Sequence, residues 1–200
     1  MSGKGPSRVV AMLGAFLCGL VLVFGAILVM TGRAPSPIGP AVAAVGGPFQ
    51  LEDQNAKPVS DKDMKGRPFL VFFGFTHCPD VCPTTLFDIS QVLKSLGQDA
   101  DRTGALFITV DPERDTPAAL KDYLSNFDPH LRGLTGDPAA VEAALKAYRV
   151  YAKKVPLKGD DYTMDHTAVV YLMDKDGRFV APFNLKRTPE AAAKELRGYL

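Results

Sequence analysis

The feature that most constrains this chain is an apolar segment that ends close to a pair of cysteines. Residues Pro68–Phe75 form a nearly continuous apolar run, and Cys78 and Cys82 follow it. Such a run is typical of a strand buried on both faces of a sheet. The next segment, Thr84–Leu96, has apolar residues at the three-and-four spacing of a helix, and Gly97 supplies a stop. The sequence therefore predicts a buried strand, a cysteine-bearing loop and a helix in direct succession.

Strand and helix patterns alternate through the rest of the globular part. A second buried strand is predicted at Leu106–Val110. Pairs of an N-cap residue with a first-turn proline predict further helices at Thr116–Phe127, at Asp137–Tyr148 and from Thr188 onward. Turn signals predict a short opening hairpin over Phe49–Gly66 and a second hairpin formed by Ala168–Met173 and Phe179–Phe183. Residues Val150–Val155 are expected to be extended. This order predicts an α/β, thioredoxin-like fold with a central mixed sheet flanked by helices.

The topology brings distant residues to one edge of this sheet. Right-handed crossovers make the first two buried strands parallel, so Cys78 and Asp111 follow them at the same edge. In a thioredoxin-like sheet the strand from Ala168 runs antiparallel to these, which puts the preceding His166 at the same rim. Two thiols and an imidazole that lie far apart in the sequence are therefore predicted to meet.

A long apolar run lies near the N-terminus. Residues Val9–Met30 carry no charge, and as a helix rising about 1.5 Å per residue they would reach roughly 33 Å, enough to cross a bilayer. A cleaved signal peptide usually has a shorter apolar core of about 7 to 15 residues, so a retained anchor is favoured. Lys4 and Arg8 precede the run while only Arg33 closely follows it, which keeps the N-terminus in the cytoplasm.

These patterns predict four parts of the chain. They are a cytoplasmic N-terminus at 1–8, a transmembrane anchor at 9–30, a flexible tether rich in proline and alanine at 31–46, and the thioredoxin-like domain at 47–200. The anchor is expected to cross a bacterial inner membrane once, with the domain in the periplasm, because the span begins too early for an organelle presequence.

Composition narrows the function classes further. The net charge of +1 over 200 residues gives no reason to expect nucleic acid as a partner. Cys18 lies in the apolar run and is expected only to fill space. Because only two cysteines remain in the domain, the chain is not a disulfide-dense scaffold, and the thiol pair is expected to be functional.

The two thiols are predicted at the start of a helix. Pro83 lacks an amide proton and suits a first turn, so the helix is expected to begin near it, with Cys82 as the N-cap. Both sulfurs then lie near the positive end of the helix dipole, which favours thiolate and lowers the thiol pKa. The spacing also permits a redox-active disulfide between Cys78 and Cys82.

The surroundings of the pair favour metal binding over disulfide exchange. Thioredoxin-type exchange enzymes usually have two residues between their cysteines and a proline facing them, whereas here the gap is three residues and Asp165–Thr167 contains no proline. Two thiolates and the imidazole of His166 form a soft donor set that suits Cu(I), and the imidazole also permits Cu(II) with an added oxygen ligand. Structural zinc usually requires four protein ligands, and the sequence offers no obvious fourth.

Three ordered motifs carry a resemblance to a known family. GFTHCPDVCP at Gly74–Pro83, VDPERDTP at Val110–Pro117 and DYTMDH at Asp161–His166 together resemble the Sco/SenC family of copper-binding, thioredoxin-like membrane proteins. The resemblance spans most of residues 47–200 and fits a single N-terminal anchor.

This resemblance implies a ligand set, a role and partners. The copper ligands would be Cys78, Cys82 and His166. The implied role is to supply copper to the binuclear copper centre of cytochrome c oxidase. The implied partners are the copper-bearing subunit of that oxidase and an upstream periplasmic copper donor.

Other polar residues near the motifs have simpler explanations. His77 adjoins the first cysteine, but alternation at a strand end turns its side chain away. His130 is expected to be a solvated loop residue, and Asp80 to cap the helix. Three acidic residues could tune the site or contact a partner, but turn and helix-capping roles explain this segment equally well: Asp111, Glu113 and Asp115. A solvated surface or a docking patch explains three lysines: Lys153, Lys154 and Lys158.

Three functions remain open at this point. A metallochaperone would bind one copper and hand it over by ligand exchange. A thiol-disulfide reductase would keep the oxidase copper-site cysteines reduced, with Cys78 or Cys82 as the nucleophile. A redox or copper sensor would signal to a membrane partner through the tether. A peroxidase is less favoured, because Thr76 lies two residues before Cys78 where such enzymes commonly have three.

Overall fold

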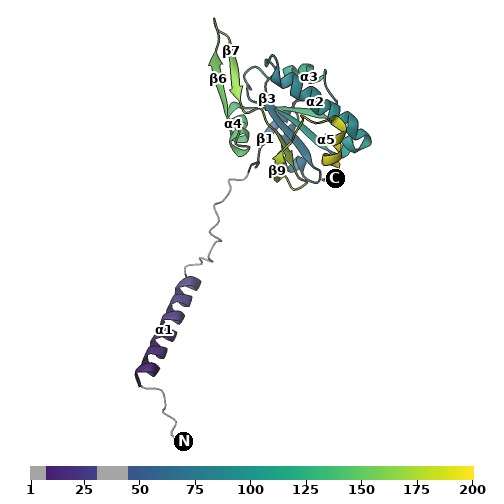
Figure 1. Cartoon of the computed structure of the whole chain (residues 1–200). Coiled ribbons are helices and arrows are strands. Elements are labelled where there is room, and N and C mark those ends of the chain that lie inside the picture. Colours follow the sequence, from purple (N-terminus) through teal and green to yellow (C-terminus); the bar gives the residue numbers. More distant parts are fainter. Residues whose placement is uncertain (1–7, 31–44) are drawn as a thin grey trace. The chain divides into compact units, whose positions relative to one another are not determined.

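The computed structural model describes residues 8–30 and 45–200. The chain divides into two units, Met1–Val42 and Ala43–Leu200, which we describe separately. In the first unit, helix α1 spans Arg8–Met30 (Figure 1). Neither described stretch contains a helix with both the length and the apolar character needed to cross a membrane. The structure thus does not support the transmembrane anchor predicted at 9–30, and most of the predicted cytoplasmic and tether segments, 1–7 and 31–44, lie outside the described residues.

A seven-stranded mixed sheet forms the centre of the second unit, in the order β2-β1-β5-β4-β3-β8-β9. Its three central parallel strands are β3 Phe69–Gly74, β4 Gly104–Thr109 and β5 Leu131–Thr135. The antiparallel strands are β1 Gln50–Asp53, β2 Pro58–Ser60, β8 Val170–Met173 and β9 Phe179–Pro182. Every residue of β3 and β4 is buried, because helices cover both faces of the sheet.

Three helices lie on one face of the sheet and a fourth on the other (Figure 1). The first group is α2 Val81–Leu96, α3 Pro117–Leu124 and α5 Pro189–Arg197, and the opposite helix is α4 Pro138–Ala147. Two short 3₁₀ segments complete the helical structure, η1 Asp61–Met64 and η2 Gly97–Arg102. The predicted N-caps are confirmed, since the side chains of Thr116, Asp137 and Thr188 each accept an amide hydrogen bond from their helix.

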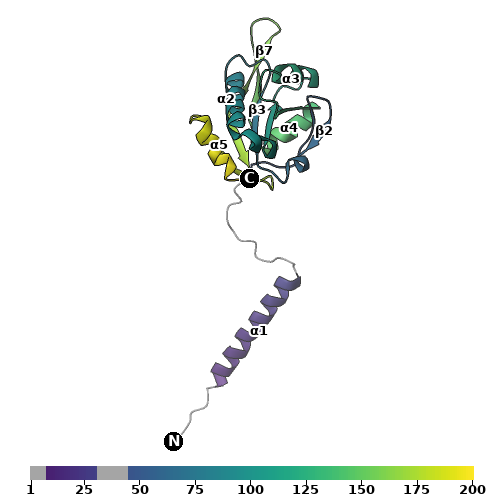
Figure 2. The same ribbon diagram turned by 90° about the vertical axis from the view of Figure 1, so that its right-hand side faces the viewer.

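A two-stranded hairpin stands apart from the central sheet. It consists of β6 Ala152–Pro156 and β7 Tyr162–His166, which pair with each other in antiparallel register. Both views show it projecting beyond the sheet and its helices (Figures 1 and 2). Every residue of the two strands is at least partly exposed, so a large apolar core does not hold the hairpin in place.

Most of the predicted elements are confirmed, and the arrangement is the predicted thioredoxin-like one. Two strands were missed by the sequence patterns, β5 and β7. Both are short and lack a continuous apolar run, and they form because a neighbouring strand offers backbone partners. Within β5, Gly133 is required by packing, because a Cβ there would lie 2.6 Å from Leu124 Cδ1. Helix α3 also stops at Leu124, earlier than the predicted Phe127.

Candidate metal centre

The two thiols lie in the connection between β3 and α2. Cys78 is half-buried in the loop and its amide donates to the carbonyl of Phe75 at 3.3 Å, while Cys82 lies in the first turn of α2 and is 0% exposed. The amide of Cys82 donates to Cys78 Sγ at 3.4 Å, and both thiols are free. The loop therefore presents one accessible sulfur and one sulfur enclosed by the core.

Cys82 packs against the last residue of β3. A Cβ placed on Gly74 would lie 2.7 Å from Cys82 Sγ and 2.7 Å from Cε2 of Phe107. These distances are far below ordinary van der Waals contact, so the glycine leaves the space that the sulfur and the ring occupy. The position of the buried thiol is consequently set by the core of the sheet and not by the loop alone.

His166, at the end of β7, faces the same sulfur. Its Nε2 lies 3.8 Å from Cys82 Sγ, and its ring packs edge-on against Phe75 with 5.8 Å between ring centroids. Its Nδ1 lies 3.2 Å from the carbonyl oxygen of Thr167. A carbonyl oxygen only accepts, so Nδ1 carries the proton in this contact and Nε2 of the neutral ring keeps its lone pair.

Burial shifts the pKa values of His166 and Cys82, which face each other, in opposite directions. It lowers the pKa of His166, although the contact with the Thr167 carbonyl and the charge of Asp165 oppose the change. Burial also raises the pKa of Cys82 strongly, which outweighs the hydrogen bond from Phe75 that favours the thiolate. The free site therefore holds a neutral imidazole beside a protonated thiol at neutral pH.

Three expectations about this helix terminus are wrong. The helix begins at Val81 and its N-cap position is Asp80, so Cys82 lies inside the first turn and is not the N-cap. The side chain of Asp80 makes no capping hydrogen bond. The predicted lowering of the thiol pKa does not hold for Cys82, because desolvation in the core exceeds the effect of the helix dipole.

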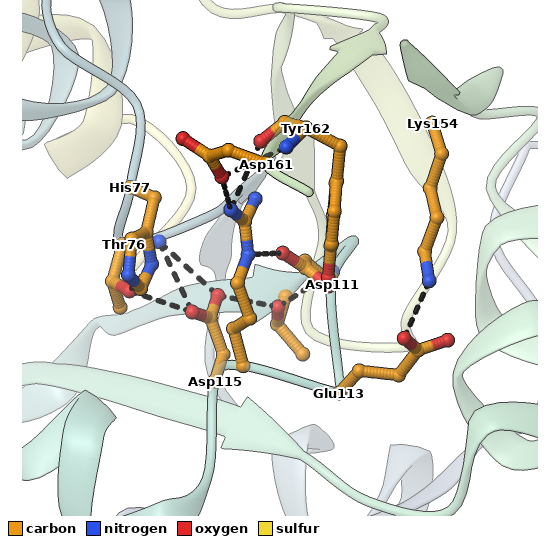
Figure 3. A network of polar contacts seen from close by, with 10 residues as sticks. Thr76, His77, Asp111, Glu113, Asp115, Lys154, Asp161 and Tyr162 are labelled. Atoms are coloured by element: carbon orange, nitrogen blue, oxygen red, sulfur yellow. Dashed lines mark hydrogen bonds and ion pairs between the residues drawn. The ribbon is translucent and has the colours of Figure 1, made fainter. Parts of the chain in front are cut away.

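A buried carboxylate ties the thiol loop to the end of β4 (Figure 3). Asp115 accepts hydrogen bonds from the amide of Thr76 at 3.1 Å and from its hydroxyl at 2.6 Å. It also accepts one from the hydroxyl of Thr109 at 2.6 Å. Burial raises the pKa of Asp115 even though these donors favour its charged form. The carboxylate thus holds the residue that precedes the thiol loop by a set of short contacts.

A second group of contacts ties the hairpin to the same segment of the chain. Arg114 donates from Nε to Asp111 at 2.5 Å and from Nη1 to the carbonyl of Tyr162 at 2.9 Å. Its guanidinium also lies 3.8 Å from the centre of the Tyr162 ring, whose hydroxyl donates to Asp111 at 2.8 Å. Burial and the bond to Asp111 together raise the pKa of Tyr162 to about 12. Glu113 and Lys154 form a further, exposed ion pair between the two segments at 2.5 Å.

The remaining candidates lie outside the group formed by the thiols and His166. His77 is exposed, and its Nδ1 contacts the hydroxyl of Thr76 at 3.0 Å. His130 is not simply solvated, since it lies between Asp128 at 2.6 Å and Asp101 at 3.1 Å. The exposed Lys153 and Lys158 fit the predicted solvated surface. Across residues 8–30 and 45–200, no three or more His, Cys, Asp and Glu side chains have the arrangement of an assembled metal site.

Sequence comparison places the chain among known proteins. The profile of the SCO1/SenC family matches residues 39–200, a range that includes both parts of the candidate site, the thiol loop and the hairpin. This chain belongs to the SCO1/SenC family.

Three relatives show what this SCO1/SenC protein resembles. The copper-bound structure of ScoI from Bradyrhizobium japonicum is 69% identical to it with a TM-score of 0.78, and covers 78% of this chain and 100% of that chain. A SCO2-like protein of Rickettsia prowazekii is 40% identical over 154 residues, 76% of this chain and 73% of the relative. BsSco, a Sco-family cytochrome c oxidase assembly protein in which a disulfide switch was identified, is 26% identical with a TM-score of 0.63, covering 82% of this chain and 98% of that chain.

Several side chains of this SCO1/SenC protein that surround the candidate ligands were not predicted from the sequence. Thr76, Arg114 and Tyr162 all lie within the three quoted motifs, but their types suggested no metal chemistry. The available signal was their position, since the first two motifs lie where β3 and β4 end and the third forms β7, which carries His166. Only the fold shows that Arg114 meets Tyr162 across 48 residues of sequence.

Proposed function

We propose that this protein is a copper metallochaperone that binds one copper ion through Cys78, Cys82 and His166. The observation that carries the proposal is the 3.8 Å separation of Cys82 Sγ from His166 Nε2. With bonds of about 2.3 and 2.0 Å, the lengths typical of zinc, a sulfur and an imidazole nitrogen bound to one ion lie about 3.5 to 3.7 Å apart at tetrahedral to trigonal angles, close to this separation. The second thiol is on the same loop and accepts the amide of Cys82.

The chemistry of these donors suits copper as a cargo. Two thiolates and one imidazole form a soft, three-donor set that favours Cu(I), and a Cu(II) ion is accommodated if an oxygen ligand is added. The copper-bound relative at 69% identity supports the same metal. A half-buried Cys78 beside a buried Cys82 leaves one side of the site open to an incoming ligand. Copper then leaves by stepwise exchange of ligands with a partner.

We propose the copper-bearing subunit of cytochrome c oxidase as the recipient, and a periplasmic copper donor upstream. The description of BsSco as a cytochrome c oxidase assembly protein supports this direction of transfer. Transfer is measured by mixing the loaded protein with the copper-free oxidase copper domain and following the absorption of the binuclear centre. Copper that stays on this protein under anaerobic, reducing conditions would exclude the oxidase as recipient.

The ligand assignment is tested by anaerobic Cu(I) titration against a competing chelator. Replacing His166 with Ala removes one of three donors, and we expect copper affinity to fall more than about tenfold, equivalent to about 1.4 kcal/mol. The Cys78–Cys82 disulfide should still form in this variant. His77→Ala is the matched control, because that exposed imidazole adjoins the loop but contacts Thr76. Equal copper affinity of the two variants would show that His166 is not a ligand.

Thiol-disulfide reduction is a second candidate, favoured by the free thiol pair and by the disulfide switch of the relative BsSco. The Cys78 thiolate would attack a partner disulfide and form a mixed disulfide. Cys82 would then resolve it, which leaves a Cys78–Cys82 disulfide here and a dithiol on the partner. This reaction needs no copper and should be insensitive to His166→Ala, so turnover of an oxidised copper-site peptide by the copper-free variant distinguishes it from metal transfer.

We also propose that the uncharged run 9–30 holds the protein at a bacterial inner membrane, with the domain in the periplasm. The basis is the sequence, since the run has the length of a span and basic residues precede it. Alkaline carbonate extraction of membranes tests this. The full chain should stay with the membrane while a chain that starts at residue 45 should not, and release of both would contradict the anchor.

A further inference from the structure

One short segment contacts both parts of the candidate site without supplying a proposed ligand. This brace segment, Asp111–Asp115, follows β4 (Figure 3). Its last two residues engage opposite partners, because Asp115 binds the start of the thiol loop and Arg114 binds the hairpin. The brace segment is thus bonded both to the loop that carries the two thiols and to the hairpin that carries the imidazole.

The contacts of Asp115 are those of an anchor for the thiol loop. The carboxylate is buried and accepts hydrogen bonds from three donors, the amide and hydroxyl of Thr76 and the hydroxyl of Thr109, with closest distances of 2.6 to 3.1 Å. Thr76 lies two residues before Cys78, and the amide of Cys78 closes a turn onto Phe75. Fixing Thr76 to the end of the adjacent strand therefore fixes where the loop leaves the sheet.

The contacts of Arg114 are those of a clamp on the hairpin. Its side chain is 19% exposed and pairs with Asp111, whose side chain is 0% exposed. The planar guanidinium engages Asp111 through Nε, the Tyr162 carbonyl through Nη1 and the Tyr162 ring through its face. A lysine cannot reproduce this geometry, because a single ammonium lacks the fork and the flat face.

The hairpin depends on this clamp because apolar packing of its strands is slight. Ala152 and Met164 are only partly buried against the core, and every other residue of β6 and β7 is also at least partly exposed. Arg114 grips Tyr162, the first residue of β7, while His166 is the last. The Phe75 ring lies between Arg114 and His166 and connects the two ends of β7. The Arg114 guanidinium lies 5.9 Å from the centre of this ring, and the ring packs against His166.

We propose that Arg114 and Asp115 are positioning residues that assemble the copper site from its two halves. Asp115 sets the thiol loop, and Arg114 sets the hairpin so that His166 stays against Cys82. This inference rests on the proposed copper function. It also makes a prediction about the metal-free protein, in which the two residues hold different segments in place.

The experiment compares Arg114→Lys and Asp115→Asn in the purified full chain, first without metal. Hydrogen exchange followed by mass spectrometry should show amide exchange in residues 152–166 accelerated about tenfold by Arg114→Lys, with residues 75–82 unchanged. Asp115→Asn should show the reverse pattern and a faster alkylation of Cys78. Tyr162→Phe is a milder second variant that removes only the hydroxyl bound to Asp111, and its change should be confined to the hairpin.

The matched controls come from a similar pair elsewhere in the fold. Arg132 on β5 donates to the buried Asp53 on β1 at 2.9 and 3.3 Å, and β4 separates these two strands from β3 in the sheet. Arg132→Lys and Asp53→Asn make the same chemical changes at a partly buried ion pair. Both should leave exchange in the thiol loop and the hairpin as in the unchanged protein.

The ligand shell of the copper-loaded protein is then measured, because a general loss of stability would not remove one type of ligand selectively. X-ray absorption of the copper-loaded Arg114→Lys protein should show a weakened imidazole shell with the sulfur shell intact, and copper affinity about tenfold lower. The positioning roles of Arg114 and Asp115 would be refuted if amide exchange were the same in Arg114→Lys and in Arg132→Lys. They would also be refuted if Arg114→Lys accelerated amide exchange equally in the hairpin and in the thiol loop. A different result would contradict the proposed function, namely an unchanged copper affinity in His166→Ala. That result would not alter the exchange pattern expected for the metal-free Arg114→Lys and Asp115→Asn proteins.

Discussion

Gly74 is the position where one added methyl group tests how the core holds the copper site. The substitution Gly74→Ala places a Cβ 2.7 Å from both Cys82 Sγ and Phe107 Cε2. Ordinary van der Waals contact begins at 3.4 Å, so the sulfur, the ring or the strand has to move. Phe107 and Cys82 are both 0% exposed, but Phe107 lies within the central strand β4 whereas Cys82 lies in the first turn of α2 next to the half-buried Cys78, which makes this turn the more adjustable side.

The size of the effect follows from overpacking. Inserting a methyl group into a close-packed core typically costs about 1 to 3 kcal/mol in the free energy of unfolding. Part of that strain is relieved by displacing Cys82 from His166, whose 3.8 Å separation suits a shared ion. If about 1.4 kcal/mol is expressed at the sulfur, copper affinity falls about tenfold.

The assay pairs urea denaturation of the metal-free protein with anaerobic copper titration. Gly104→Ala is the matched control, because its Cβ would meet Met64 Cε and Phe69 Cβ, each at 2.7 Å, at the opposite end of β3 and β4. Both variants should lose stability, but only Gly74→Ala should lose copper affinity. Equal copper affinities with equal losses of stability would refute the claim that core packing at Gly74 places the sulfur.

The remaining predictions concern pH, thiol accessibility and capping. The hydrogen bond to Asp128 raises the pKa of His130, so its stabilising contribution is complete below the unfolded pKa of about 6.5 and disappears as the pH rises through the folded pKa. Unfolding free energies of the protein and of His130→Asn should therefore converge with rising pH. In the metal-free protein, iodoacetamide should modify the half-buried Cys78 well before Cys82, which is buried and has a raised pKa. Thr188→Ala removes the side-chain cap of α5 and should reduce stability by about 1 kcal/mol.

Each of these predictions has a result that would contradict it. A constant difference between the two unfolding free energies from pH 5 to 9 would mean that His130 does not hold its proton more tightly in the folded state. Equal modification rates of the two thiols would contradict the burial of Cys82. A serine at position 188 retains the capping oxygen, so a loss of stability in Thr188→Ser equal to that of Thr188→Ala would assign the effect to packing instead.

Much of the fold was predictable because its signals are local. The apolar run at β3 and the threonine-proline pairs before α3 and α5 each depend on neighbouring residues. The family could be inferred from motifs in one chain, and the nearness of Cys82 and His166 from the directions of the strands. These inferences need only the order of elements and the handedness of their connections.

Other properties of the site depend on contacts between distant segments. The strands β5 and β7 exist through pairing, and Arg114 reaches Tyr162 across 48 residues. The raised pKa of Cys82 reverses the local expectation, because desolvation by the packed core outweighs the helix terminus that the sequence shows. Residue types and spacing thus specify which donors are available. Burial and long-range hydrogen bonds, which no local pattern encodes, decide their protonation and how they are held together.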